Sequence, residues 1–347
     1  MVRRVNDQLE PTWRKRDWAP IGAVLLGVGY GAFARLTFGL KWHALEGLFT
    51  AVSLMFLFAV PFVLGVLTVR YASSSGPTSW LTWLFRPWLA CLLLAFVFGA
   101  LAWEGAICLV IAAPIYLFMS SLGGVVAGLH DRSARRRGID DSRYLLGVVL
   151  ALPFALSPLE QRVTAHTEHR LVETSVRIDA DADTVFRNLA EVPEIRSDEQ
   201  HYGFFQSIGI PRPLQATLSQ PGVGGVRDAR FVEGIRFRET VTRYEPGKSL
   251  AFTIAVDPAS IAPGTLDEHV RVGGPYFDAE YGEFRIEPRP EGGVLLHLLS
   301  RHRVATHFNF YARLWTDAIM RDLQTGICTI IRDRSEREAR RSVPGRN

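Results

Sequence analysis

The sequence has few cysteines and lacks several common enzyme motifs. Its 347 residues include three cysteines, Cys91, Cys108 and Cys328, which lie far apart. Three scattered cysteines are too few for a disulfide framework or a zinc site. A glycine-rich phosphate loop between strand and helix, a Gly-x-Ser-x-Gly elbow and a His-Glu-x-x-His motif are all missing. We therefore expect no metal and no cofactor.

An excess of one charge is also missing. Lysine and arginine number 39, aspartate and glutamate number 35, and the formal net charge is +4. Much of the basic excess lies beside apolar runs or in the tail after Arg332. This placement is typical of membrane sidedness rather than of nucleic-acid binding. The sequence therefore predicts a lipid bilayer as a partner and no nucleic acid.

Long apolar runs dominate the first half of the chain. Five runs cover residues 18–40, 47–69, 87–103, 105–129 and 144–159. Because about 20 apolar residues span a bilayer, residues 1–160 predict a transmembrane domain of about five helices. The runs hold almost no ionisable residues, which usually mark a transport path. An anchor or a scaffold is therefore expected.

The first and the third apolar runs each carry a further feature. The first run also fits a signal peptide, with small residues at Ala32 and Ala34. Its length and the runs that follow favour a membrane span. Three tryptophans, Trp80, Trp83 and Trp88, stand at the start of the third run. They predict an interfacial aromatic belt.

The fifth run decides on which side of the membrane the second half lies. Its roughly 15 residues reach only about 23 Å as a helix, short of a hydrocarbon core near 30 Å. If it crosses, the amino terminus, Arg70, Arg86 and the basic residues of 132–143 all share one side, which is the cytoplasm by the positive-inside rule. The second half is then periplasmic in a bacterial inner membrane. If the run only lies on the surface, the second half is cytoplasmic.

The second half alternates in the manner of a sheet. A strand from His169 leads into a helix capped by Asp181 or Asp183. A long helix, about Phe308 to Glu336, ends the pattern with an apolar residue at every fourth position. Six further strands are predicted at 214–219, 225–232, 235–244, 249–256, 277–287 and 293–304. We expect an α+β domain over residues 166–338, an antiparallel sheet curled around the last helix, and a disordered basic tail at 339–347.

Three segments in this order resemble the START-like superfamily, also called SRPBCC, in its polyketide cyclase/dehydrase branch. They are Val176–Phe186, Tyr244–Phe252 and Tyr311–Ile319, and the resemblance covers about Arg170 to Ser335. It implies the helix-grip fold and a hydrophobic ligand pocket between sheet and helix. It does not imply one reaction, because fold does not fix function.

Acidic residues on neighbouring strands are the first catalytic candidates. In the strand 235–244, Phe237, Glu239 and Val241 share the face expected to point inward. A two-residue turn at Glu233-Gly234 places Asp228 directly across from Glu239, where two carboxylates can share a proton. The alternatives are a one-residue register error or pairing with nearby arginines, Arg230 or Arg285.

The remaining candidates line the expected pocket. His297 and Arg301 share a face with Leu295 and Leu299, although a buried histidine is more often structural. His302 and His307 lack metal-site spacing, and Asp317 either orients a ligand or caps the helix. The loop 257–275 is either a lid over the pocket or an excursion. The predicted ligand-binding residues are Phe237, Glu239, Phe252, Tyr281, His297, Arg301, Tyr311, Trp315 and Ile319, with Glu239, Asp228 and His297 as catalytic candidates.

Three functions follow from these patterns. The leading one is a membrane-anchored binding protein for a hydrophobic small molecule or lipid. The second is a cyclase- or dehydratase-like enzyme that uses acidic or histidine residues of the pocket. The third is an envelope scaffold whose interior is filled by its own side chains.

Overall fold

The structure is a computed structural model, and it describes residues 18–39, 52–73, 79–137, 142–200, 203–256 and 271–342. The chain divides into two compact units. The helical unit is drawn from residues 1–103 and 112–164, and the sheet unit from residues 165–347 together with 104–111. The predicted lid loop falls mostly on residues 257–270, outside the described residues.

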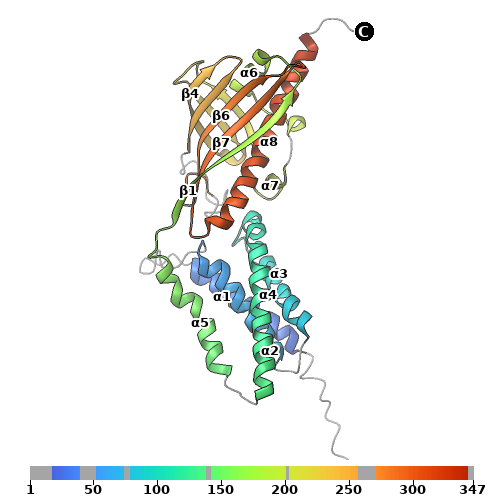
Figure 1. The fold of residues 1–347 in the computed structure, drawn as a ribbon, viewed down its shortest axis with the longest axis vertical. Helices are drawn as coiled ribbons and strands as arrows, with labels where there is room; N and C mark the ends of the chain where they lie inside the picture. Colours follow the sequence, from blue (N-terminus) through green and yellow to red (C-terminus); the bar gives the residue numbers. More distant parts are fainter. Residues whose placement is uncertain are drawn as a thin grey trace, which may run out of the picture. The chain divides into compact units, whose positions relative to one another are not determined.

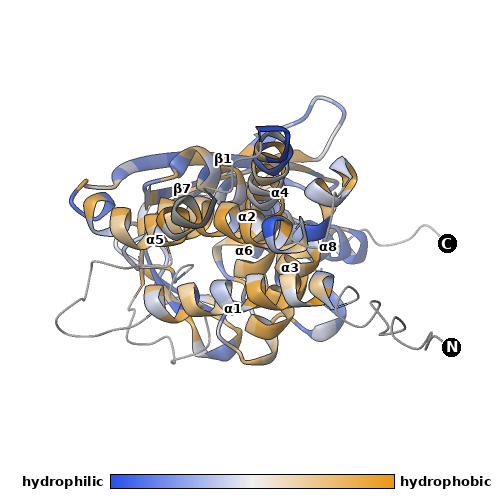
Figure 2. Ribbon diagram, turned by 90° about the horizontal axis from the view of Figure 1, so that it is seen from below, coloured by the Kyte–Doolittle hydropathy of each residue, from blue (hydrophilic) through white to orange (hydrophobic). Residues whose placement is uncertain are grey.

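All the described elements of the first unit are helices. They are α1 (Ala19–Gly39), η1 (Met55–Ala59) continuing into α2 (Val60–Ser73), α3 (Trp80–Ala100), α4 (Ala106–Arg137) and α5 (Ser142–Glu160). Hydrophobic residues, orange in Figure 2, run along α1, α3 and α5. Four of the described helices are long and apolar enough to cross a membrane, namely α1, η1 with α2, α3 and α4. The prediction of about five such helices is corrected to four, because the apolar part of α5 is the shorter stretch Leu146–Glu160.

The third helix begins earlier than predicted. Ser79 caps α3, because its side chain accepts a hydrogen bond from the Thr82 amide. The helix begins at Trp80 and includes Pro87, so the three tryptophans of the predicted belt lie within α3. Trp83 is buried, and the indole of Trp88 donates to the Ser121 hydroxyl at 2.8 Å. These two side chains join α3 to α4.

Glycines bring α2 and α4 into backbone contact. A Cβ atom placed on Gly65 would overlap the Ser120 carbonyl, and one on Gly123 would overlap the Phe62 carbonyl. Small residues at such crossings allow two helices to approach closely in a membrane. The close packing of α2 against α4 therefore requires glycine at positions 65 and 123.

The last helix of the unit, α5, packs along α1. The Tyr30 hydroxyl donates to the Leu150 carbonyl at 3.2 Å, and the Phe154 ring lies 5.7 Å from the Phe38 ring. At the end of α5, the Glu160 carboxylate accepts the Leu54 amide at 2.6 Å, just before η1. Residues later in α1 meet residues later in α5, so these two helices run in the same direction, and α5 ends where the η1–α2 helix begins.

The sheet unit is one antiparallel sheet with a long helix against it (Figure 1). Its strand order is β1-β7-β6-β5-β4-β3-β2. The strands are β1 (His166–Ile178), β2 (Pro213–Leu218), β3 (Val226–Phe231), β4 (Arg236–Glu245), β5 (Ser249–Val256), β6 (Phe277–Pro288) and β7 (Val294–Thr306). The helices are α6 (Ala182–Ala190), the single turns η2 (Ser197–Glu199) and η3 (Val232–Gly234), α7 (Phe204–Ser207) and α8 (Asn309–Ser342). The predicted α+β class and the order of elements are confirmed.

The core lies between the sheet, α6 and α8. Leu189 of α6, Phe284 and Leu296 of the sheet, and Ile331 of α8 are buried together. Asp181 is the cap of α6, since its carboxylate accepts the Thr184 amide at 2.9 Å. The phase of α8 differs from the prediction, because its buried face carries polar residues as well as apolar ones. That face consists of Asp317, Met320, Gln324, Cys328, Ile331 and Ser335.

Two further boundaries differ from prediction. The predicted apolar stripe of the last helix flanks the buried face, and of its members only Ile331 is fully buried, while Tyr311, Trp315, Ile319, Leu323 and Ile327 are half-buried. The helix also continues to Ser342, so a disordered tail from residue 339 begins too early. An ion pair of Arg340 with Glu336, one helical turn back, supports this extension.

Candidate functional site

Ionisable residues form a row across the inner face of the sheet. On one side, Arg170 of β1 pairs with His302 of β7. On the other side, Glu239 of β4 lies between Arg227 of β3 and Ile254 of β5. Both groups stand two residues beyond the row that Phe252, Gly282 and Ser300 form across β5, β6 and β7. One level of the sheet therefore carries four ionisable side chains toward the interior.

His302 is the most deeply buried of the four, with 0% of its surface exposed. Its Nε2 atom lies 3.2 Å from the Thr316 hydroxyl and 3.5 Å from a carboxylate oxygen of Asp317, both at the start of α8. The Arg170 guanidinium donates to both oxygens of that carboxylate, at 2.7 and 3.4 Å. The Phe277 ring lies 5.5 Å from the imidazole. Strands β1 and β7 and helix α8 thus fix this histidine together.

The imidazole is neutral and one of its nitrogens lacks a partner. Burial lowers the pKa of His302 to about 4, against the opposing effect of the Asp317 carboxylate. Among the described residues, the buried Nδ1 atom has no hydrogen-bond partner. A buried polar atom without a partner costs about 1–3 kcal/mol, so such an atom points to a ligand or an ordered water.

The other side of the row holds a buried ion pair. Arg227 and Glu239 are both buried, and the guanidinium donates to the carboxylate. Burial raises the pKa of Glu239, and the charge of Arg227 opposes that rise. The guanidinium also lies over the Phe252 ring, 5.5 Å from its centre. Its Nε atom has no hydrogen-bond partner within the part of the chain that the structure describes.

Several predicted site residues lie on this inner side. Phe237, Glu239 and Phe252 face inward from β4 and β5, as the alternation predicts. Tyr311, Trp315 and Ile319 are half-buried on α8. The Trp315 ring meets Phe205 of α7 edge to face at 6.3 Å. A role of these residues in ligand binding stays a prediction.

The prediction that Asp228 faces Glu239 is wrong by one residue of register. Arg227 is the partner of Glu239, and Asp228 pairs with Arg238 on the outer face. The cause is the turn, in which Glu233 adopts a left-handed conformation with φ of 63° inside η3, so the link is longer than two residues. Asp228 instead binds Arg230 and Arg236, at 2.8 and 2.7 Å. The proposed carboxylate pair therefore does not form.

His297 and Arg301 also lie on the outer face. Strand β7 buries Leu296, Leu298, Ser300, His302 and Val304, the opposite set of alternate residues. Leucines occur on both faces of β7, so alternation alone does not give the phase. On the outer face, the Nδ1 atom of His297 lies 2.8 Å from both the Ser175 hydroxyl and the Glu173 carboxylate.

Tyr281 also lies on the outer face, since it alternates with the buried Gly282. It keeps the register of the rest of β6, opposite Arg301, and the register shift between Ala279 and Tyr281 moves only the residues before it. The Arg301 guanidinium lies over the Tyr281 ring, 5.6 Å from its centre. Tyr281, His297 and Arg301 are therefore removed from the inner site, and none of them faces the row.

Sequence reasoning missed Arg170 and Arg227 and did not join His302 to Asp317. Arg170 meets His302 only through the pairing of β1 with β7, which the local pattern does not contain. Gln324 was missed in the same way. Its amide donates to the Val172 carbonyl and the Ser300 hydroxyl at 3.0 and 2.9 Å. The spacing of Asp317, Gln324 and Ser335 along α8 is the one signal that marks a polar helix face.

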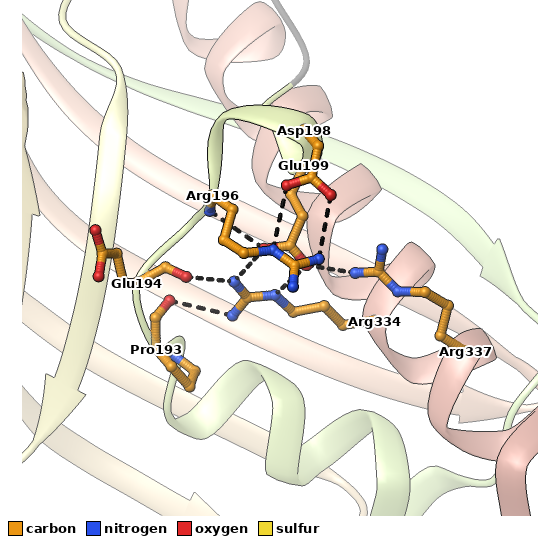
Figure 3. Close-up of polar contacts among 7 residues, drawn as sticks. All are labelled: Pro193, Glu194, Arg196, Asp198, Glu199, Arg334 and Arg337. Carbon is orange, nitrogen blue, oxygen red and sulfur yellow. Dashed lines mark hydrogen bonds and ion pairs between the residues drawn. The ribbon is translucent and has the colours of Figure 1, made fainter.

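A second polar cluster fastens α8 to the segment after α6 (Figure 3). Glu199, which is buried, accepts hydrogen bonds from Arg334 at 2.8 and 3.2 Å and another from Arg337. Arg334 also donates to the carbonyls of Pro193 and Glu194 at 3.1 and 2.9 Å. The bonds from Arg334 and Arg337 hold the pKa of Glu199 at about 2. The polar groups of Glu199 and Arg334 bond to each other or to backbone, so we assign this cluster a structural role.

A shallow depression beside α8 is less apolar than the predicted pocket. Three of its six lining residues are polar, namely Gln200, Gln206 and Arg212, and the others are Pro213, Gly326 and Ile330. In addition, no group of three or more histidine, cysteine or carboxylate side chains suited to a metal ion occurs among the described residues.

Comparisons with known proteins give structural likeness only. No family model matches the chain, and no curated protein matches it. A protein of unknown function from Rhizobium leguminosarum is 15% identical, with 52% of this chain and 100% of that chain covered and a TM-score of 0.30. Truncated norcoclaurine synthase from Thalictrum flavum is 12% identical, with 49% and 96% covered and a TM-score of 0.32. A Mesorhizobium loti protein is 18% identical, with 50% and 99% covered and a TM-score of 0.29.

Proposed function

We propose that the sheet unit binds a hydrophobic small molecule or lipid between the inner face of the sheet and the first half of α8. The observation that carries this is the fully buried His302, whose Nδ1 atom has no partner within the described residues. Buried polar atoms in native proteins usually have a hydrogen-bond partner. A bound molecule with a polar group at this point supplies the missing partner.

The surroundings of His302 support an apolar ligand. Trp315, Ile319 and Leu323 lie on α8 on either side of Asp317, and all three are half-buried. Pairing between β5 and β6 ends at Thr253 and Tyr281, although β6 itself continues back to Phe277. The β5–β6 pairing therefore ends near the level of the row, and we propose this edge as the point of entry for an apolar molecule.

An enzyme is the second candidate, and one observation favours it. The Asp317 carboxylate lies on the Nε2 side of His302, while Nδ1 is unpartnered. A carboxylate that orients an imidazole and leaves its second nitrogen free is the arrangement of a general base. His302 therefore replaces Asp228 and His297 as the candidate base, and Glu239 is already engaged by Arg227.

Native mass spectrometry of the full chain in mild detergent, followed by extraction, tests the binding function. We expect a defined apolar mass on the wild type and a lower occupancy by that mass in His302→Leu. His297→Leu, on the outer face of the same strand, is the matched control and should keep the mass. The unfolding temperature of each variant separates ligand loss from misfolding. An empty wild type that also takes up no apolar fluorescent probe contradicts the proposal and favours a scaffold.

We also propose that the chain is a multi-pass protein of a bacterial inner membrane, with the sheet unit on the periplasmic side. The support comes from α5, which runs in the direction of α1 and ends at the start of the η1–α2 helix. Besides the four long apolar helices, we propose α5 as a shorter crossing, because it packs alongside α1 and its apolar part covers Leu146–Glu160. Local thinning of the bilayer accommodates a short span. Ala165 then follows on the side away from the basic residues.

Single cysteines test this topology. In a chain without its three native cysteines, we expect Val163→Cys to react with a membrane-impermeant maleimide in cells whose outer membrane alone is permeabilised. Arg136→Cys, at the end of α4, should react only after the inner membrane is lysed. Equal protection of both positions in the first condition would place α5 on the membrane surface and the sheet unit in the cytoplasm.

A further inference from the structure

The hydrogen-bonding groups around His302 determine what kind of ligand group can bind to its unpartnered Nδ1 atom. Asp317 receives the Arg170 guanidinium on both oxygens, so it faces the imidazole as an acceptor. The Thr316 hydroxyl donates to the Arg313 carbonyl at 3.4 Å, so toward His302 its oxygen is also an acceptor. Both neighbours of Nε2 are thus acceptors. The proton of the imidazole therefore belongs on Nε2.

A neutral imidazole carries one proton, and its second nitrogen is then an acceptor only. Full burial of His302 keeps the ring neutral, because charging it would cost desolvation energy. Nδ1 is consequently a buried lone pair that needs a donor. None of the described residues supplies one.

From this geometry we infer that the ligand is a neutral apolar molecule with a hydroxyl group, an alcohol or a phenol, and that this hydroxyl donates to Nδ1 of His302. The inference rests on the proposed binding function and narrows its ligand class. A carboxylate or phosphate group would oppose the lone pair with its own, and an ether has no proton to donate. The Phe277 ring, 5.5 Å from the imidazole, provides an apolar wall beside the hydroxyl.

Three matched probes test the inference on the full chain in mild detergent: 1-naphthol, 1-methoxynaphthalene and 1-naphthoate. Binding is measured by equilibrium dialysis, with empty micelles subtracted. We expect 1-naphthol to bind about 3- to 10-fold more tightly than its methyl ether, the worth of one neutral hydrogen bond. Naphthoate should bind most weakly, because burying a carboxylate against an acceptor is costly.

Variants assign the preference to one atom. His302→Leu should bind both neutral probes equally, whereas His302→Gln, whose amide oxygen still accepts, should retain part of the preference. His297→Leu should behave as the wild type. The unfolding temperature of each variant is recorded beside its binding.

The possible outcomes distinguish a wrong ligand class from a failure of the proposed binding function. If no probe binds the wild type, the proposed binding function fails. If the two neutral probes bind equally, if naphthoate binds best, or if the preference survives in a folded His302→Leu, a hydrophobic site exists but the hydroxyl inference is wrong. Equal binding of the neutral probes would also mean that an ordered water satisfies Nδ1.

Discussion

Replacing Gly65 by alanine is expected to destabilise the helical unit by about 3 kcal/mol or more, at the upper end of overpacking effects. The added methyl group would overlap the carbonyl of Ser120 on α4. A side chain can rotate away from such a clash, but a carbonyl moves only with its helix. Gly123→Ala should have a similar effect, since its methyl group would meet the Phe62 carbonyl on α2.

The same substitution elsewhere provides the control. Gly29 in α1 and Gly147 in α5 have no neighbouring atom within 4 Å of an added Cβ. In a helix, alanine is favoured over glycine by about 1 kcal/mol, so Gly29→Ala and Gly147→Ala should leave stability unchanged or raise it slightly. Circular dichroism during heating in detergent measures all four variants. A Gly65→Ala protein that unfolds at the wild-type temperature would show that α2 and α4 do not meet at their backbones.

Removing the Glu199 carboxylate is expected to cost the sheet unit about 3–5 kcal/mol, the usual price of breaking a buried ion pair on one side. Glu199→Ala leaves Arg334, whose side chain is 12% exposed, without its charge partner. The segment after α6 then loses its main attachment to α8 (Figure 3). Asp198→Ala is the neighbouring control, because Asp198 is mostly exposed and such substitutions change stability by about 0.5 kcal/mol or less.

The Glu199 carboxylate also makes the free energy of unfolding depend on pH. The pKa of Glu199 in the folded protein is about 2, below its ordinary value of 4.5. A lowered pKa stabilises the folded state above the ordinary value, and this stabilisation is lost as pH falls from about 4.5 toward 2. It corresponds to about 3 kcal/mol at neutral pH. Thermal unfolding between pH 7 and 3 should show a smaller loss in Glu199→Gln than in the wild type, and parallel curves would contradict this assignment.

Local sequence determined which elements form. Apolar runs of sufficient length became four helices fit for a membrane, and period-two alternation marked the seven strands. The inward face of β4 was also predicted correctly, since the apolar Phe237 and Val241 alternate with Arg236, Arg238 and Thr240. These features depend on residues a few positions apart, so the pattern contains the information needed to find them.

Tertiary structure decided everything that depends on distant partners. The register of β3 on β4 followed the conformation of Glu233, and the phase of β7, with leucines on both faces, followed its pairing with β1 and its packing on α8. The direction of α5 was settled by its contacts with α1 and with the start of the η1–α2 helix. The candidate site belongs to this second group. Arg170, His302 and Asp317 meet only when the first strand, the last strand and the last helix come together, because a hydrogen-bonded cluster is set by packing rather than by the order of residues along the chain.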